Sequence, residues 1–571
     1  MSDSSEKRSF NLITEPWIPI AGFGEVSLWD VFTHPEYRRL GGTPVETVVL
    51  MRLLLAIVHA SNTIKTTADW QSLTPALLAA NARSYLEKWR DRFDLFDETY
   101  PFLQFPQLKG KCKEVSIGSL AFPVASGNKT ALTQWSINER FSVSETARLL
   151  LCASGYGLGG GKYDLFAKID PNGPEKRKKP TGKASAPQGP LVGYKGFLHS
   201  CMLGETLLES VHLNLLTEEI LLKLKLFSDS DPMGRPFWES RLTDESGESA
   251  KKYVSGYQGI LFPLDKIFCL DGEKLLMTQG ITYPSHKNGQ WDPGITLFSE
   301  KKDVKALWCD VEKKPWRQLA SLLKFFDVDE NTTMPAFLVW GCARLNLAED
   351  SMKSFGIWTG GISVSSNSGE YYVSGKNDFI SSEFLIPLDW VASGATDYLL
   401  FKSFMSMLSD YALAVYGSVF RYFNDFKDDR KDDLAAAATR LFWEKMEPHA
   451  QEVIDLTVEK DPEVVEAHKK AWQRIGTSCY EQLCPSISPR QIQIFVKNMP
   501  NFKPKKKNGG KAAGSTDKTA NAADSLESRK GCAKDEADRE VTSTVSEFEM
   551  LVEKETKSEQ QFKKRKPYEG E

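Results

Sequence analysis

Apolar residues recur at the three- and four-residue steps of a helix in several stretches of the chain. Residues 44–59 are apolar on most sides. The preceding Thr43, with Pro44 and Glu46, combines a helix cap, a first-turn proline and a capping-box acid. This pattern predicts a buried helix that runs through His59. We interpret His59 as a core histidine with satisfied hydrogen bonds rather than as a ligand.

Apolar spacing and turn residues also predict the elements that follow. Residues 74–93 predict a second helix, and residues 142–155 predict a third, which Ser142 and Glu145 begin and Gly155 ends. The middle of the chain mixes both kinds of element. We expect strands at 259–262, 266–269 and 370–373, helices at 316–326 and 334–345, and a glycine- and serine-rich loop at 358–369.

From about Ala395 the pattern becomes helical. Further helices are expected at 432–447, 448–458, 461–482 and 489–497, which together suit a four-helix bundle. Beyond Phe502 the chain is rich in Lys, Ser, Ala and Asp and poor in aromatic residues. We expect this part to be disordered, with transient helix near 545–557.

These patterns predict an α+β fold in three parts: a large mixed N-terminal domain (1–390), a C-terminal helical bundle (391–501) and a disordered charged tail (502–571). The 571 residues, 41% of them hydrophobic, are enough for two or three domains with a sizeable core. The net charge of −4 argues against nucleic-acid binding over the whole surface. Any such contact must come from local patches or from partners.

Cysteine and targeting patterns bear on location. The nine cysteines are scattered without a CxxC pair, which is typical of free thiols in a reducing compartment. No signal peptide or membrane span is expected, because Arg52 interrupts the longest apolar run, Val48–Val58. We therefore expect a cytoplasmic protein with no membrane partner.

No catalytic constellation is recognisable. None of the seven histidines stands at HxH, HxxxH or His-Asp spacing, and no GxSxG elbow occurs. The acidic residues lie mainly in segments where solvent exposure explains them. The sequence thus indicates a protein that is not an enzyme, with no catalytic residues, no metal site and no cofactor.

The densest chemical signal is the segment Ser154–Lys162, in which five of the seven residues 155–161 are glycines. Backbone of this kind can turn sharply or lie close against a ligand. The following segment, 162–200, holds eight Lys or Arg and three Asp or Glu. A loop with few side chains beside local positive charge suits a phosphate or nucleic-acid contact. The same residues also fit a flexible surface loop whose charges are solvated.

The loop departs from two nucleotide-binding motifs. A Walker loop needs a glycine five residues before the Gly-Lys pair and Ser or Thr after it, but Tyr156 and Tyr163 occupy these positions. The pattern GxGxxG is present at 155–160, but it follows a helical pattern rather than a strand. A nucleotide-binding enzyme that uses Gly155–Lys162 remains the alternative function, which thermal stabilisation by a nucleotide would support.

Four motifs occur in a particular order: NLITEPWIPI at 11–20, PFLQ at 101–104, a polar loop at 126–142 before a helix, and GYGLGGGK at 155–162. In this order the chain resembles the CasA family, the large subunit of the type I-E CRISPR effector complex, Cascade. The resemblance implies a non-catalytic subunit of a ribonucleoprotein in antiviral defence. Such a subunit reads the protospacer-adjacent motif (PAM) in duplex DNA and helps to start R-loop formation.

The resemblance also implies partners. These are the guide CRISPR RNA, the target double-stranded DNA, the backbone, small and 5′-handle-binding subunits of Cascade, and a helicase-nuclease recruited in trans. The guide reads most of the target by base pairing, and the helicase-nuclease carries the catalysis.

Members of this family read the PAM largely from the minor groove with three elements. The glycine loop matches Gly157, Gly159, Gly160 and Gly161, where backbone without Cβ can approach the groove floor. A lysine finger matches Lys274 by order along the chain; a turn lysine in water is the other interpretation.

The third element is a glutamine-bearing wedge after a Gly-Gly pair. Here Gly360-Gly361 precedes a segment without glutamine, in which Ser366, Asn367 and Ser368 are the candidates for PAM contact. The polar loop at 126–142 matches a loop of this family, and the resemblance implies that it contacts the guide-RNA 5′ handle and neighbouring subunits. Its candidates are Asn128, Lys129 and Gln134.

Overall fold

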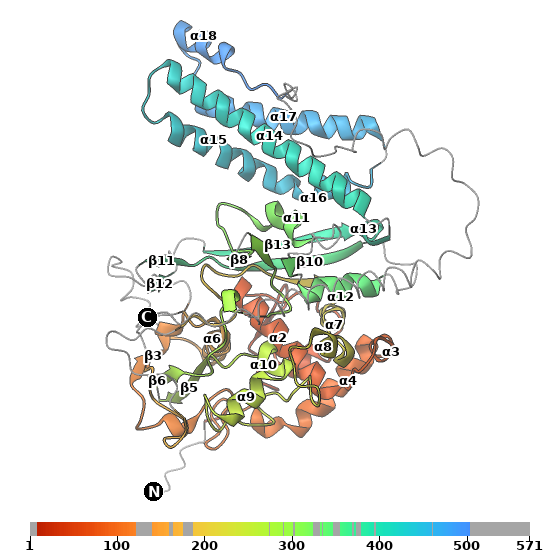
Figure 1. Ribbon diagram of the computed structural model, residues 1–571, viewed down its shortest axis with the longest axis vertical. Helices are drawn as coiled ribbons and strands as arrows, with labels where there is room; N and C mark the ends of the chain where they lie inside the picture. The colour runs from red at the N-terminus through yellow and green to blue at the C-terminus, as the bar shows by residue number, and fades with distance from the viewer. Residues whose placement is uncertain are drawn as a thin grey trace, which may run out of the picture. The chain divides into compact units, whose positions relative to one another are not determined.

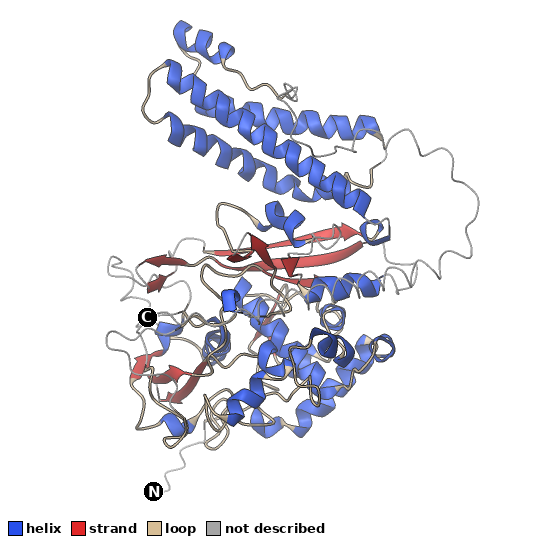
Figure 2. Cartoon of the chain, viewed as in Figure 1, coloured by secondary structure: helices blue, strands red, loops and turns tan. Residues whose placement is uncertain are grey.

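The computed structural model describes residues 8–121, 140–158, 164–174, 187–272, 274–288, 291–300, 303–323, 332–333, 335–345, 354–367, 370–372, 378–392, 395–459 and 461–502. The described residues divide into two compact units, one that ends at Val391 and one that begins at Ala392. Unit 1 contains helices and strands, whereas the described part of unit 2 is helical (Figure 2). The α+β fold class expected from the sequence is confirmed. The expectation for the tail lies outside the described residues.

Helix α2 (Pro44–Ser61) is the central helix of unit 1 (Figure 1). It packs against four other helices and against two strands of a sheet. Every residue from Val48 to His59 is buried. Among the described helices only α2 has the length and apolar composition of a membrane span, and most of it is buried inside the unit.

Unit 1 also contains the other helices that precede α14 in the chain. They are α1 (Leu28–Val31), α3 (Thr67–Ser72), α4 (Pro75–Lys88), α6 (Val143–Tyr156), α7 (Leu207–Leu213), α8 (Glu218–Leu224), α9 (Glu248–Val254), α10 (Tyr257–Leu261), α11 (Leu319–Leu322), α12 (Ala336–Leu345) and, at the end of the unit, α13 (Asp389–Ala392). Of these, α4, α6, α7 and α10 contact α2.

The strands of the described residues form small antiparallel sheets. The largest has the order β13-β10-β4, from Phe379–Pro387, Ser354–Ile362 and His199–Leu203, and its first two strands pack on α2. A second has the order β3-β6-β5, from Glu114–Ser116, Lys274–Gln279 and Lys266–Asp271. The others are β8-β7-β9 (Asp303–Ala306, Leu297–Glu300, Thr332–Thr333), β1-β2 (Ile18–Ile20, Gly24–Val26) and β11-β12 (Ser365–Asn367, Glu370–Tyr372).

The predicted helix starts are confirmed where side chains cap them. Thr43 Oγ1 accepts a hydrogen bond from the Glu46 amide at 3.3 Å, and Glu46 Oε2 accepts one from the Thr43 amide at 2.7 Å. Ser142 and Glu145 form the same reciprocal pair at the start of α6. Local chemistry alone decides these positions, because the capping partners are three residues apart.

Four predictions about the bounds or type of an element are wrong. The second helix, α4, ends at Lys88 rather than near residue 93, and a 3₁₀ turn follows it. Residues 257–261 form helix α10 instead of a strand, because a short apolar run fits either element and here its amides bond back along the chain. Part of the expected loop at 358–369 belongs to strand β10, and helix α6 continues past the expected end at Gly155 to Tyr156.

Residues 354–362 form the nine-residue strand β10 in the middle of a sheet. Gly360 and Gly361 lie in this buried strand rather than in a loop. A Cβ on Gly361 would lie 2.6 Å from the Phe197 carbonyl oxygen and 2.8 Å from Cys309 Sγ. Close approach of neighbouring chain segments, rather than a turn, therefore explains these two glycines.

Unit 2 is a bundle around three long helices, α14 (Ala395–Asp425), α15 (Lys431–Met446) and α17 (Pro462–Leu483), which all contact one another. The shorter α16 (Ala450–Asp455) and α18 (Pro489–Lys497) contact α14. The helices expected at 432–447, 461–482 and 489–497 are confirmed within two residues at each end. Their apolar positions form the core that Trp472 and Tyr480 share with α14.

Candidate nucleic-acid interface

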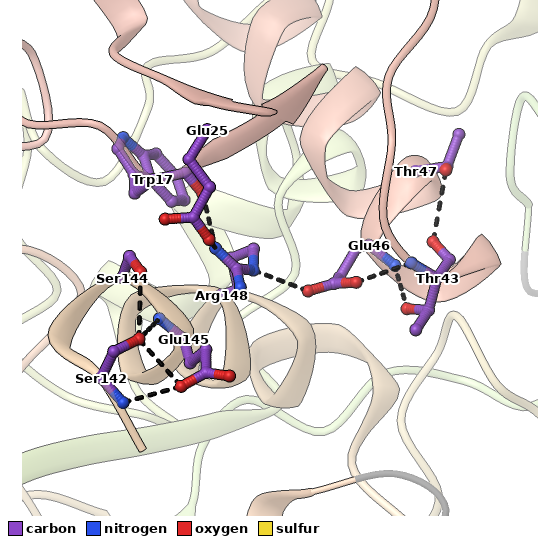
Figure 3. A network of polar contacts seen from close by, with 9 residues as sticks. All are labelled: Trp17, Glu25, Thr43, Glu46, Thr47, Ser142, Ser144, Glu145 and Arg148. Atoms are coloured by element: carbon purple, nitrogen blue, oxygen red, sulfur yellow. Dashed lines mark hydrogen bonds and ion pairs between the residues drawn. The ribbon is translucent and has the colours of Figure 1, made fainter. Parts of the chain in front are cut away.

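Helix α6 leads directly into the glycine loop, and Arg148 fixes this helix to the N-terminal part of the chain (Figure 3). Arg148 Nε donates to Glu46 Oε1 at 2.8 Å, and Nη1 donates to Glu25 Oε1 at 2.5 Å and to the Trp17 carbonyl at 2.9 Å. Its side chain is only 12% exposed. Glu46 thus serves both the cap of α2 and the attachment of α6.

This network gives a physical reason for the N-terminal motif at 11–20. Trp17 is fully buried and donates its indole N–H to the Leu12 carbonyl at 2.9 Å. Its own carbonyl is one of the acceptors of Arg148. The decamer therefore holds the helix that carries the glycine loop, although the two segments are 131 residues apart.

The C-terminal end of α6 is held by backbone-to-backbone contact. The amides of Leu191 and Gly189 donate to the carbonyls of Gly155 at 3.1 Å and Gly157 at 2.7 Å. A Cβ on Gly189 would lie 2.2 Å from the Gly155 oxygen, and one on Gly155 would lie 2.6 Å from Leu191 Cδ1. These glycines permit the segment 189–191 to lie against the helix, and Gly155 is inside the last turn rather than beyond it.

Gly157, the first candidate residue of the loop, packs inward. A Cβ at this position would lie 2.7 Å from Lys266 Cε and 2.9 Å from its Nζ. Lys266 is the first residue of β5 and is 1% exposed. Because Gly157 has no Cβ, the beginning of the loop packs directly against a buried lysine.

Lys266 is part of a buried polar cluster with Asp265 and Gln279. Its ammonium forms an ion pair with the Asp265 carboxylate, and both side chains are 1% exposed. Gln279 Nε2 donates to the carbonyl and to Oδ1 of Asp265, both at 2.9 Å. Burial lowers the pKa of Lys266 and raises the pKa of Asp265, because each charged form loses hydration; the attraction between them opposes both shifts.

The hairpin of β5 and β6 connects this cluster to Lys274. Lys266 begins β5, and Lys274 begins β6 opposite Asp271, at the other end of the hairpin. Along β5, Asp271 lies five residues beyond Lys266, which corresponds to a distance of about 17 Å between the two ends of the hairpin. Gln104 of the PFLQ motif supports this hairpin, because its Oε1 accepts from the Leu270 amide at 2.8 Å.

Lys274 is exposed, as is required both of a lysine that contacts DNA and of a turn lysine in water. Its side chain is 62% exposed and forms an ion pair with Glu114 of β3. The hydrogen bond that Lys274 Nζ donates to this carboxylate raises the pKa of Lys274, so its ammonium stays charged. Lys109, paired with Asp271 at 3.4 Å, is a second exposed cation at this hairpin.

The wedge candidates lie in a small hairpin. Ser366 pairs with Tyr371 and Asn367 with Glu370 in the β11-β12 ladder, which stands between β10 and β13 in the chain. The Ser363 amide donates to the Asp378 carbonyl at 2.8 Å and closes the base of this insertion. In the view of Figure 1, β11-β12 and β3-β6-β5 stand at the same side of unit 1.

Several predicted site residues lie outside the described part of the chain: Gly159, Gly160, Gly161, Ser368, Asn128, Lys129 and Gln134. The structure describes Gly157 and Lys274 and joins them through the β5-β6 hairpin. Sequence reasoning missed Arg148, Gly189 and the Asp265–Lys266 pair. For the Asp265–Lys266 pair, the signal in the sequence was a charged dipeptide directly before the apolar run 267–270.

Metal ligands, thiols and one cavity among the described residues bear on the chemistry that this part of the chain can support. They contain no group of three or more His, Cys, Asp or Glu that could hold a metal ion, and their eight cysteines are free. Burial raises the pKa of the Cys201 thiol to about 12, so it is not a ready nucleophile. A cavity of about 240 Å³ is lined mainly by apolar side chains such as Leu226, Phe227 and Trp291, and its one charged side chain is a carboxylate, Asp292. This lining does not suit a phosphate.

The fold is that of CRISPR-associated proteins of known structure. It resembles the crystal structure of CasA from Thermus thermophilus, with a TM-score of 0.64 and 18% identity over 86% of this chain and 98% of that one. It also resembles Cse1 from Thermobifida fusca, with a TM-score of 0.62 and 19% identity over 96% and 98% of the two chains. A chain of a CRISPR RNA-guided surveillance complex has a TM-score of 0.63 at 18% identity, over 86% of this chain and 98% of that one.

Sequence comparison identifies the family. Residues 11–476 match the family model of CRISPR-associated protein Cse1. The CRISPR-associated protein CasA/Cse1 of Thermus thermophilus is 29% identical over 262 residues, which cover 43% of this chain and 46% of that protein, less than half of its length. The chain belongs to the Cse1 (CasA) family, and the family expected from the sequence is confirmed.

Proposed function

We propose that this chain is the non-catalytic large subunit of a type I-E Cascade surveillance complex. In this role it recognises the PAM in double-stranded DNA, helps to start R-loop formation and serves as the docking platform for a helicase-nuclease in cytoplasmic antiviral defence. Family membership over residues 11–476 and the likeness to a chain of a CRISPR RNA-guided surveillance complex support this role. Its partners would be the guide RNA, the target duplex and the other Cascade subunits.

One structural observation carries the proposal furthest. The separate motifs of the chain converge on the support of one loop: Trp17 and Glu46 hold α6 through Arg148, and Lys266 seats Gly157 where the loop begins. A site that reads a DNA groove with backbone needs such a fixed frame, because a misplaced loop would lose its contacts. The β5-β6 hairpin extends the frame to Lys274.

Affinity purification of the full chain, co-expressed with candidate guide RNA and sister subunits, tests the proposal. We expect guide RNA and the sister subunits to co-purify, and the assembled complex to prefer duplexes that carry one short motif. The pure chain should leave DNA intact with magnesium or manganese. Thermal stabilisation by a nucleotide without any RNA-containing complex would support the alternative enzyme, and metal-dependent cleavage that co-elutes with the chain would contradict the non-catalytic role.

A further inference from the structure

Helix α18 of unit 2 presents an exposed apolar face. Ile492 and Val496 are 47% and 63% exposed and lie one turn apart, so they share one side of the helix. Ile487, just before the N-cap, is 89% exposed, and Met499, just after the C-cap, is 42% exposed. We call these four residues the α18 apolar face. Four large exposed apolar side chains on and directly beside so short a helix indicate an interaction site.

The other side of α18 is fixed to the bundle. The Tyr480 hydroxyl donates to the Phe495 carbonyl at 2.9 Å, and the two rings lie 4.8 Å apart. Asn498 Nδ2 and Lys497 Nζ both reach Asp425 Oδ2, at 2.9 and 3.0 Å. The α18 apolar face is therefore presented by a rigidly attached helix rather than by a frayed end.

The sequence of the same chain contains a segment with a matching pattern. Apolar residues at Val541, Val545, Phe548 and Val552 follow the spacing of one helix face, and Thr544 and Glu547 have capping-box spacing. The segment 545–555 also holds four Glu and one Lys. An acidic amphipathic helix fits an apolar face in a basic setting.

The sequence that contains and follows α18 supplies the basic residues. Residues 487–507 contain six Lys or Arg and no Asp or Glu. Attraction between this stretch and segment 545–555 favours their encounter, and it weakens with salt.

The connecting chain is of a suitable length. Phe502, anchored against Tyr411 with ring centroids 5.1 Å apart, is three residues beyond Met499. From there, 41 residues lead to Thr544. By the random-coil relation, 41 residues span about 32–38 Å root mean square, which exceeds the length of α18, about 14 Å. The local concentration of the segment is then on the order of a millimolar, so even a weak site is occupied.

We propose that residues 545–555 of this chain dock as an amphipathic helix on the α18 apolar face. Phe548, Val545 and Val552 supply the apolar contacts, and the Glu residues lie toward the basic stretch around α18. Any partner that uses this face of unit 2 must then displace the chain's own tail.

Hydrogen exchange of the full chain, read at residues 545–555, tests the proposal. Val496→Asp changes the face and Phe548→Asp changes the segment; both sites lie outside the packed core of the described units, so folding is not at risk. Met550→Asp is the matched control, because residue 550 lies about 200° around the helix from Phe548. We expect amide exchange in 545–555 to be about tenfold slower in the parent chain and in Met550→Asp than in the other two variants, and to accelerate at high salt.

The same measurement at several protein concentrations identifies the occupant. Protection that does not depend on concentration supports docking within one chain. Protection that grows with concentration would assign the face to a second copy and overturn the proposal. Exchange at unprotected rates in the parent chain, or protection that survives Val496→Asp, would overturn it as well.

Discussion

Nη2 of Arg52 lies 2.7 and 2.8 Å from the two carboxylate oxygens of Asp292, although 240 residues separate them in the chain. Both side chains are 3% exposed. Arg52 also donates to the Ile260 carbonyl at 3.3 Å, and Asp292 accepts from the Gly294 amide at 2.8 Å. The arginine that interrupts the apolar sequence of α2 is thus neutralised inside unit 1 and ties α2 to the second half of that unit.

We expect Arg52→Met to lower the free energy of unfolding by about 3–5 kcal/mol, because it leaves the Asp292 carboxylate buried without its cation. Asp292→Asn should cost a similar amount, since it leaves the guanidinium uncompensated. Denaturant unfolding of both variants and of the double variant measures this. If the double variant costs as much as the sum of the single ones, the two side chains are not coupled and the interpretation fails.

His59 is buried as predicted, but its hydrogen bonds are not satisfied. Neither ring nitrogen has a hydrogen-bond partner among the described residues, and the Tyr257 ring stands edge-on at 5.4 Å. Burial lowers the pKa of His59 to about 3, and the positive charge of Arg344 acts in the same direction. Between about pH 3 and the unfolded value of 6.5, the unfolded chain binds the proton and the folded chain does not, so stability rises with pH through this window.

We therefore expect His59→Phe to reduce the loss of stability between pH 7 and pH 5 by about 2 kcal/mol. The variant should keep most of the parent's stability at pH 7, because removing two unpaired polar atoms offsets the strain of the larger phenyl ring. His199 remains in the variant and, with a pKa lowered by burial to about 4, leaves a residual slope of the same sign. Thermal unfolding at several pH values tests this; an unchanged pH dependence would contradict the assignment.

Gly189→Ala should displace segment 189–191 from α6. The new Cβ would lie 2.2 Å from the Gly155 oxygen and 2.7 Å from the Gly157 nitrogen, and backbone atoms cannot yield as a side chain can. We expect a loss of about 1–3 kcal/mol of stability and weaker PAM-dependent binding by the assembled complex. Gly41→Ala is the matched control, because its nearest neighbour is 3.4 Å away. Equal effects of the two substitutions would show that the contact at α6 has no special role.

Local chemistry explains which parts of the fold the sequence could predict. The caps at Thr43 and Ser142 and the helices of the bundle depend on residues within a few positions of each other. The role of Gly361 could not be predicted, because its reason is a Phe197 carbonyl 164 positions earlier. Likewise Lys266 is visible as a charge before a strand, but its contact with Gly157 exists only in the folded unit.

The order of the motifs predicted the family but not how the motifs cooperate. Nothing local relates Trp17 or Gln104 to the glycine loop or to Lys274. The structure supplies the links, through Arg148 and through the Leu270 amide. Among the candidate DNA contacts, Lys274 is described with its side chain, so substitution of this residue tests its role directly.

Lys274→Ala should weaken PAM-dependent binding about tenfold, the order expected for one lost charge-assisted hydrogen bond to a base edge. Lys109→Ala removes an equal charge from the same hairpin region, where Lys109 pairs with Asp271. It should lower binding to duplexes with and without the PAM alike, and by less. Binding isotherms of the assembled complex on both duplexes separate the two effects. A uniform loss from Lys274→Ala as well would make it a turn lysine that contributes only charge.

The hairpin that contains Asn367 is the candidate wedge that separates the DNA strands. Opening the first base steps beside the PAM costs on the order of a few kcal/mol, so a wedge must occupy the gap while the guide begins to pair. Asn367 is the last residue of β11, opposite Glu370, and the base of the hairpin is closed by the bond between Ser363 and Asp378. Its amide can bond a base edge as a glutamine would, with a shorter reach.

We expect Asn367→Ala, or glycines at 365–368, to slow opening of a paired target about tenfold. A target already mismatched beside the PAM should be much less affected, because there the unstacking work is already done. A fluorescent base next to the PAM reports strand separation on both duplexes. If both substrates lose opening equally, or neither changes, residues 365–368 are not the wedge, and the hairpin only connects β10 to β13.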